Sequence, residues 1–141
     1  MRTLIVEDDF VSRNLLNRML EPFGECDIAV NGKEAVKAFH RALDDENPYD
    51  LVCLDIMMPE MDGKEVLETI RDYEIEKEIV GSDNTKIIMT TALDDPKTIM
   101  SSFRNQCDAY IVKPIDMKQI IKYLISLKLV TKDTIYQKLR I

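Results

Sequence analysis

Five polar side chains of complementary chemistry each stand at the end of a short apolar run or within three residues after it. Asp8 and Asp9 follow residues 2–6 with Glu7 just before them, Asp55 follows residues 51–54, Thr91 ends residues 86–91, and Lys113 follows residues 109–112. Grouped carboxylates repel one another unless a cation compensates them, and an all-oxygen set with room for water suits Mg²⁺. A carboxylate can also attack phosphorus and become an aspartyl-phosphate, while a hydroxyl and an ammonium group hold the other phosphoryl oxygens.

The spacing of the apolar residues predicts five strands that alternate with five helices. The expected strands are residues 2–6, 26–30, 51–54, 86–91 and 109–112, and the helical pattern covers 11–23, 36–43, 66–70, 99–107 and 117–124. Apolar strands separated by helices are typical of a parallel sheet covered on both faces. We therefore expect an α/β fold, a doubly wound, flavodoxin-like (βα)5 sheet with strand order 2-1-3-4-5. In that order the carboxyl ends of the strands meet at one crevice, which would bring the five polar groups together.

Some local features of these helices are also predicted. The first helix is expected to bury one face, made of Val11, Leu15, Leu16, Met19, Leu20 and Phe23, and to stop at Gly24. Asp116 is a plausible N-cap for the fifth helix. Residues 72–85 make an unusually long connection, which we expect to extend the third helix and then form a loop.

Four sequence blocks resemble the response-regulator receiver family of two-component signalling. They are VEDD (6–9), LDIMMPEMDG (54–63), MTTA (89–92) and YIVKP (110–114), and they occur in the order typical of that family. The resemblance covers residues 1 to about 129. It implies a phosphoacceptor domain in which Asp55 receives the phosphoryl group.

The resemblance also implies a metal site beside Asp55. Asp8 and Asp9 would hold Mg²⁺, Asp9 directly and Asp8 through water, and the backbone carbonyl of Met57 would complete the protein ligands. The neighbouring residue Glu7 is not assigned a role. A simpler reading of Asp8 and Asp9 is that they cap the first helix, because acidic residues favour helix N-termini.

Further residues would hold the phosphoryl group and report its presence. By resemblance, Thr91 would hydrogen-bond a phosphoryl oxygen, Lys113 would pair with the group, and Tyr110 would turn inward when Thr91 moves. The peptide bond between Lys113 and Pro114 would be cis. Thr90 is an alternative to Thr91, which is preferred because Ala92 follows it.

The resemblance implies protein partners rather than a substrate. A histidine kinase or phosphotransfer protein would donate the phosphoryl group, and phosphorylation would switch a surface made of the fourth helix, fifth strand and fifth helix. A downstream effector or a second copy of the chain would contact that surface, with Ile99, Phe103 and the exposed face of the fifth helix as candidates. The chain would not be an enzyme beyond Mg²⁺-dependent self-phosphorylation and self-dephosphorylation.

Two other function classes compete with this interpretation. A Mg²⁺-dependent phosphatase with an aspartyl nucleophile typically carries a DxD pair, but Asp55 is followed by Ile56 and Met57. A flavodoxin-like binding module would need a phosphate loop, and no glycine-rich segment follows the first strand.

Length, charge and cysteine content limit the possibilities further. The 141 residues fit one domain, expected over 1–129, with a C-terminal tail or short helix over 130–141 and no separate output domain. The formal net charge of −7 disfavours direct nucleic-acid binding. No apolar run is long enough to span a membrane, and the N-terminus does not resemble a signal peptide, so we expect a cytoplasmic protein. The three cysteines are scattered and predict neither disulfides nor a zinc site.

Overall fold

Five parallel strands form a single sheet in the order β2-β1-β3-β4-β5, which confirms the predicted fold class. The structure, a computed structural model, describes residues 1–58, 60–92 and 106–140. The strands are β1 (Arg2–Val6), β2 (Glu25–Ala29), β3 (Leu51–Asp55), β4 (Lys86–Thr91) and β5 (Ala109–Val112). The central strand β3 is buried along its whole length, as its unbroken apolar sequence predicts.

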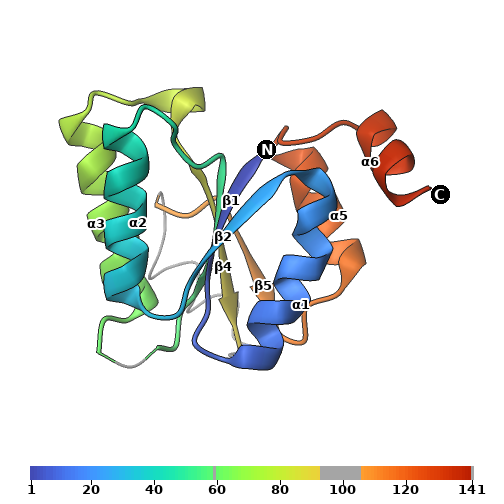
Figure 1. The fold of residues 1–141 in the computed structure, drawn as a ribbon, viewed down its shortest axis with the longest axis horizontal. Coiled ribbons are helices and arrows are strands. Elements are labelled where there is room, and N and C mark those ends of the chain that lie inside the picture. The colour runs from blue at the N-terminus through green and yellow to red at the C-terminus, as the bar shows by residue number, and fades with distance from the viewer. Residues whose placement is uncertain (59, 93–105, 141) are drawn as a thin grey trace.

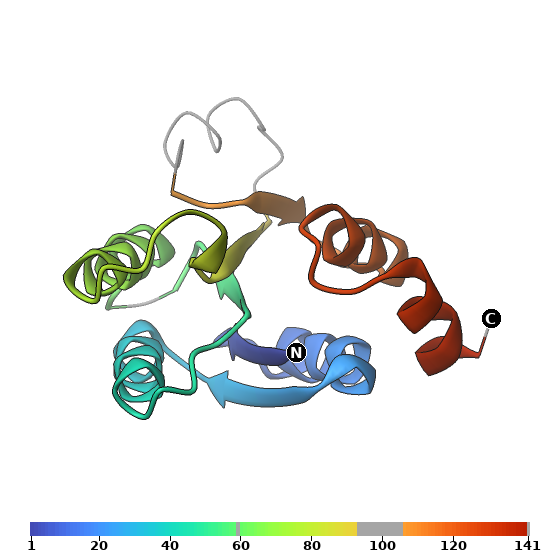
Figure 2. The same ribbon diagram turned by 90° about the horizontal axis from the view of Figure 1, so that it is seen from above.

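Helices cover both faces of the sheet (Figures 1 and 2). On one face lie α2 (Gly32–Asp44) and α3 (Gly63–Glu76); on the other lie α1 (Phe10–Leu20), α5 (Met117–Ser126) and α6 (Lys132–Leu139). Each layer has its own apolar core, because alternate residues of the strands point to opposite faces. None of the described helices has an apolar stretch long enough to cross a bilayer.

Side-chain caps fix where the described helices begin. In each, a polar side chain accepts the backbone N–H of the residue three positions later, and these caps are Asp9, Asn31, Asp62, Asp116 and Thr131. Asp116 and Gln119 form a reciprocal capping box, which confirms the N-cap predicted for the fifth helix.

The apolar face predicted for the first helix is too wide. Leu16 and Leu20 are buried under α1, and Phe23 is buried in the short 3₁₀ turn η1 (Glu21–Phe23), but Val11 is 71% exposed and Leu15 is 41% exposed. The sheet can cover only one side of a helix, so the flank that carries Val11 and Leu15 faces outward.

The long connection before β4 extends α3, as predicted, to Glu76. It continues into a 3₁₀ turn, η2 (Gly81–Asp83), whose first residue Gly81 has a positive φ of 64°. The helix predicted over 99–107 lies almost entirely outside the described residues, as do Ile99 and Phe103.

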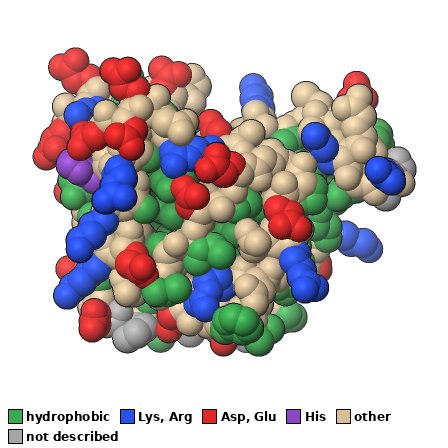
Figure 3. All heavy atoms as spheres, viewed as in Figure 1, with side chains coloured by type: hydrophobic (Ala, Val, Ile, Leu, Met, Phe, Trp, Pro, Cys, Tyr) green, Lys and Arg blue, Asp and Glu red, His purple; other side chains and the backbone are tan. Residues whose placement is uncertain are grey.

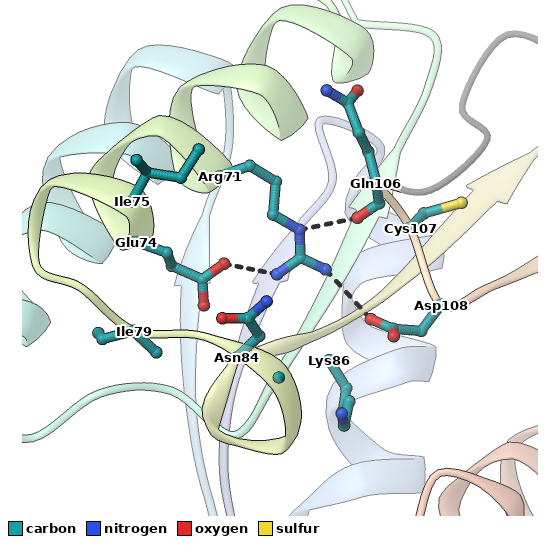
Figure 4. Close-up of a pocket in the computed structure, with 10 residues that line it drawn as sticks. Arg71, Glu74, Ile75, Ile79, Asn84, Lys86, Gln106, Cys107 and Asp108 are labelled. Carbon is teal, nitrogen blue, oxygen red and sulfur yellow. Dashed lines mark hydrogen bonds and ion pairs between the residues drawn. The ribbon is translucent and has the colours of Figure 1, made fainter.

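An arginine at the amino-terminal edge of the sheet joins α3 to the starts of β4 and β5 (Figure 4). The Arg71 guanidinium donates to the Glu74 carboxylate at 2.6 Å and the Asp108 carboxylate at 3.2 Å. It also donates to the carbonyl oxygens of Thr85 at 2.9 Å and Gln106 at 2.8 Å. Glu74 is 2% exposed, and its other carboxylate oxygen accepts the Thr85 N–H at 2.7 Å, so both oxygens of this buried group have partners.

Replacing Arg71 by lysine is expected to lower the free energy of unfolding by about 1–2 kcal/mol, because an ammonium group cannot reproduce the planar fork of donors. Urea denaturation of Arg71→Lys beside Arg18→Lys, an exposed arginine of α1, measures the difference. Equal unfolding midpoints for the two variants would show that the fork contributes nothing beyond its charge.

Candidate functional site

The polar residues predicted from the sequence meet at the carboxyl edge of the sheet. Asp55 is the last residue of β3 and is only 3% exposed, and Thr91 is the fully buried last residue of β4. Lys113 directly follows β5, and its backbone N–H donates to the Thr91 carbonyl at 2.7 Å. The parallel order of the strands therefore brings together residues from three distant parts of the sequence.

Three carboxylates form the acidic part of the site. Oxygens of Glu7, Asp8 and Asp55 all lie within 4.8 Å of one another, in the part of the chain that the structure describes. Glu7 is completely buried, Asp55 is almost so, and Asp8 is exposed. This set can hold a divalent cation with access to water, because hard cations take carboxylate oxygens as ligands.

A lysine bridges the two buried carboxylates. The Lys113 Nζ lies 3.1 and 3.0 Å from the two carboxylate oxygens of Glu7 and 3.5 Å from Oδ2 of Asp55. Burial raises the pKa of Glu7 to about 7, and the nearby Asp55 charge adds to that effect against the opposing influence of Lys113. Burial alone would lower the pKa of Lys113, but its hydrogen bond to Glu7 and the charge of Asp55 raise it overall.

Of the two aspartates predicted to hold the metal, the structure brings only Asp8 into the acidic cluster. Asp9 is not part of the acidic cluster: its Oδ2 accepts the Ser12 N–H at 2.9 Å as the N-cap of α1, and that bond lowers its pKa. Glu7, which was not among the predicted site residues, lies in the cluster. Its N–H donates to the Ala29 carbonyl at 3.1 Å, so the backbone pairing with β2 continues one residue past β1 and carries Glu7 into the site.

The sequence prediction missed Glu7 because it assigned the metal to the two aspartates, and so did not use Asp9 as the helix cap. The signal that could have found it is strand alternation, since Ile5 and Glu7 point to the same face of the sheet. Arg13 was also missed: its Nη1 donates to the carbonyl oxygens of Glu7 at 3.2 Å and Asp8 at 3.3 Å, which holds the turn between β1 and α1.

The loop after β3 returns closely to the site. A Cβ at Gly63 would lie 2.5 Å from the Asp55 carbonyl oxygen, so only glycine allows this approach. The Gly63 N–H donates to the Ile56 carbonyl at 3.1 Å, and the Met57 N–H donates to Oδ1 of Asp55 at 3.1 Å. The Met57 backbone therefore lies beside Asp55, while its side chain is 61% exposed.

The remaining predicted positions lie around β4 and β5. The peptide bond between Lys113 and Pro114 is cis, as predicted. Tyr110 is partly buried and packs against the core on the α2 and α3 face. The alternative hydroxyl, Thr90, pairs in register with Asp55 and is buried, and its Oγ1 makes no hydrogen bond among the described residues.

The separate roles of Asp8 and Asp9 predict different losses. Asp8→Ala should weaken Mg²⁺ binding by on the order of tenfold or more, because it removes one carboxylate from the cluster. Asp9→Ala should lower the urea midpoint of unfolding and leave most of the Mg²⁺ affinity, because it removes a helix cap. Mg²⁺ titration by amide NMR and urea denaturation of both variants would test this. If Asp9→Ala alone lost Mg²⁺ binding, Asp9 would be a metal-binding residue, as the sequence predicted.

Comparison with known proteins agrees with this geometry. The sequence model of the response regulator receiver domain matches residues 3–125. The regulatory protein VanRB of Enterococcus faecalis is 36% identical over 123 residues, which are 86% of this chain and 50% of VanRB. The transcriptional regulatory protein SrrA of Staphylococcus aureus is 35% identical over 119 residues, which are 84% of this chain and 44% of SrrA. The chain thus spans about half the length of these relatives.

Solved receiver structures share the fold over nearly the whole chain. The receiver domain of the histidine kinase CKI1 from Arabidopsis thaliana, complexed with Mg²⁺ and BeF3⁻, gives a TM-score of 0.76 at 25% identity and covers 92% of this chain and 90% of its own. The CheX–CheY–BeF3–Mg²⁺ complex from Borrelia burgdorferi gives 0.76 at 27% identity, with 91% and 89% covered. Family match, relatives and strand order agree that the chain belongs to the response-regulator receiver domain family.

Proposed function

We propose that Asp55 accepts a phosphoryl group from a phosphorylated histidine of a partner protein. The observation that carries this proposal is the position of Asp55: a nearly buried carboxylate within 4.8 Å of two other acids, with Lys113 Nζ 3.5 Å from its Oδ2. A carboxylate oxygen of Asp55 would attack phosphorus, forming a P–O bond as the P–N bond to imidazole breaks. The electron pair of that bond leaves with the imidazole, and the product is an aspartyl-phosphate.

Lys113 would stabilise the charge that builds up on the phosphoryl oxygens. In the unphosphorylated chain its ammonium group is held by Glu7, so it is already at the site and needs only a small shift toward a phosphorylated Asp55. Preorganised charge of this kind accelerates a reaction because no solvent has to reorganise. Thr91 at the end of the neighbouring strand is the proposed hydroxyl donor to the same group.

The acidic cluster fits Mg²⁺, with Asp8, Asp55 and the Met57 carbonyl as proposed ligands and Glu7 beside them. Three carboxylates face one lysine in the cluster, so the site has negative charge left for a cation to neutralise. The CKI1 receiver and the Borrelia CheY complex were solved with Mg²⁺. When bound, the ion would neutralise the phosphoryl oxygens during transfer.

An exposed apolar surface beside the site supports a protein phosphodonor. Phe10 is 66% exposed, Val11 71% and Leu15 41%, and all three lie on the first two turns of α1, directly after the acidic turn (Figures 1 and 3). Exposed apolar side chains that adjoin a reactive group suit a partner that must bring its own reactive group close. We place the docking of the histidine-bearing protein here.

The phosphorylated chain would act on a downstream effector and would turn over no external substrate. Thr91 lies on β4, the strand next to that of Asp55, and Tyr110 lies on β5, the strand beyond it, so a phosphoryl group on Asp55 could act through Thr91 on the surface of β5 and α5. Ile99 and Phe103, the other proposed contact residues, lie outside the described residues.

Incubation with Mg²⁺ and acetyl phosphate, followed by intact mass measurement, tests this proposal. We expect one phosphoryl adduct on the wild-type chain and none on Asp55→Asn or in the presence of EDTA. Phosphate release is followed in the same sample, so that rapid hydrolysis is distinguished from no reaction. If folded protein neither gains the adduct nor releases phosphate, the chain does not have phosphoacceptor chemistry.

A further inference from the structure

Positive charge gathers at the C-terminal end of this acidic chain. Residues 116–140 contain six lysines or arginines and two aspartates, a net charge of +4 in a chain of −7. Figure 3 shows the contrast: acidic side chains crowd the upper ends of α2 and α3, whereas lysines and arginines stand around α6 at the opposite end. The overall charge therefore hides a local basic surface.

The outward face of α5 alternates cationic and apolar side chains. Lys118, Ile121, Lys122 and Ile125 follow the spacing i, i+3, i+4, i+7, which places them on one helical face. Both lysines are exposed and both isoleucines are half-buried. No partner within the described residues covers this face beyond α6.

The C-terminal helix α6 folds back beside α5 and is held there by the turn between them. Lys128 adopts a left-handed conformation with φ of 60°, and the N–H groups of Leu129 and Val130 donate to the Leu124 carbonyl at 2.9 and 3.2 Å. Ile135 anchors α6 in the core of the α1 and α5 layer and is 3% exposed. The matched family region ends at residue 125, so α6 lies beyond it.

An apolar groove lies between the two helices. It has a volume of about 170 Å³ and is lined by Ile121, Ile125, Lys132, Ile135 and Tyr136. Tyr136 forms one wall and is 54% exposed. Lys132 lines the groove, and the exposed Lys118 and Lys122 stand on the same face of α5 as its two isoleucines, so positive charge adjoins the apolar centre. A small apolar pocket inside a charged rim is the arrangement that anchors protein interfaces.

We propose that the α5–α6 groove docks an acidic segment of a partner protein, which inserts one large apolar side chain between Ile121, Ile125 and Tyr136. Its carboxylates would lie against Lys118, Lys122 and Lys132. A nucleic acid would use the cations but has no aliphatic side chain to fill the groove, and a membrane requires apolar groups that protrude rather than a recess. This site contains none of the phosphoacceptor residues and does not depend on their function.

The probe for this site is a short, fluorescein-labelled peptide of Glu and Ala residues with one central Leu. Fluorescence anisotropy gives its affinity for the full chain, and amide NMR shifts locate it. We expect shifts on α5 and α6, and binding about tenfold weaker for Lys118→Glu/Lys122→Glu and for Tyr136→Ser. The matched control, Lys37→Glu/Lys64→Glu on the opposite face, changes the charge equally and should alter binding less than about twofold.

Other ligands show whether the apolar groove or only the positive charge around it binds the peptide. Replacing the central Leu of the peptide by Ser should weaken binding about tenfold, and equal binding would overturn the apolar part of the proposal. Vesicles of phosphatidylserine, or a short DNA duplex, that bind as tightly as the peptide and lose binding with the same lysines would overturn the choice of a protein partner. Concentration-dependent self-association that Tyr136→Ser abolishes would assign the groove to a second copy of the chain instead. Absence of peptide binding to folded wild type would also overturn the proposal.

Discussion

Replacing Lys113 by methionine is expected to slow phosphorylation of Asp55 by roughly 10²-fold, the typical loss when one preorganised donor to a charged transition state is removed. Lys113 is the cation closest to Asp55 among the described residues, at 3.5 Å from its Oδ2. Methionine keeps the length of the side chain and removes its charge. The rate of adduct formation from acetyl phosphate, at saturating Mg²⁺, measures the change.

A variant that loses one lysine charge outside the site provides the control. Lys122→Met on the exposed face of α5 alters the net charge equally but lies outside the site, so its phosphorylation rate should match wild type. Circular dichroism establishes that both variants are folded. A Lys113→Met rate within a factor of about two of wild type would exclude Lys113 from the reaction, because such a change corresponds to well under 1 kcal/mol.

Without metal, the protein is expected to lose stability as pH rises from about 5 to about 8, through Glu7. The pKa of Glu7 is about 7 in the folded chain and near 4.5 when unfolded, so between these values the folded state binds the extra proton. Stability then falls with rising pH, and the contribution of Glu7 is fully present only below the unfolded value. The difference between a pKa of 4.5 and one of about 7 corresponds to at most about 3 kcal/mol.

Glu7→Gln isolates this contribution because glutamine keeps the shape and cannot ionise. In EDTA, the variant should match wild type near pH 5 and exceed its free energy of unfolding near pH 8. Both proteins contain the same other titrating groups, so subtracting the pH profile of the variant from that of wild type leaves the contribution of Glu7. Glu68→Gln, at an exposed position of α3, should change neither end of the profile. A wild-type pH profile that runs parallel to that of Glu7→Gln would contradict the buried-carboxylate account.

The fold was largely predictable because most of its strands consist mainly of apolar residues. The observed bounds of β1, β4 and β5 coincide with the predicted ranges, since a strand covered on both faces gives an uninterrupted run that polar residues end sharply. The edge strand β2 begins one residue earlier than predicted, at Glu25. Its half-exposed sequence has no such sharp boundary.

The site was predictable only in part because the type of a residue does not determine which way its side chain points. Asp55, Thr91 and Lys113 stand where strand ends place them, but VEDD offers three adjacent acids. Only the continued pairing of Glu7 with β2 and the cap made by Asp9 show which acids point inward. The contacts of Arg71 join residues far apart in the sequence, so no local pattern predicted them.

Chemical trapping of the phosphorylated residue tests the central claim most directly. Sodium borohydride reduces an aspartyl-phosphate to homoserine, and tandem mass spectrometry of peptides then locates that homoserine. After incubation with acetyl phosphate and Mg²⁺, we predict homoserine at position 55 and aspartate retained at positions 8 and 9. Homoserine at either of those positions, or a borohydride-resistant phosphate on Thr90 or Thr91, would show that Asp55 is not the acceptor.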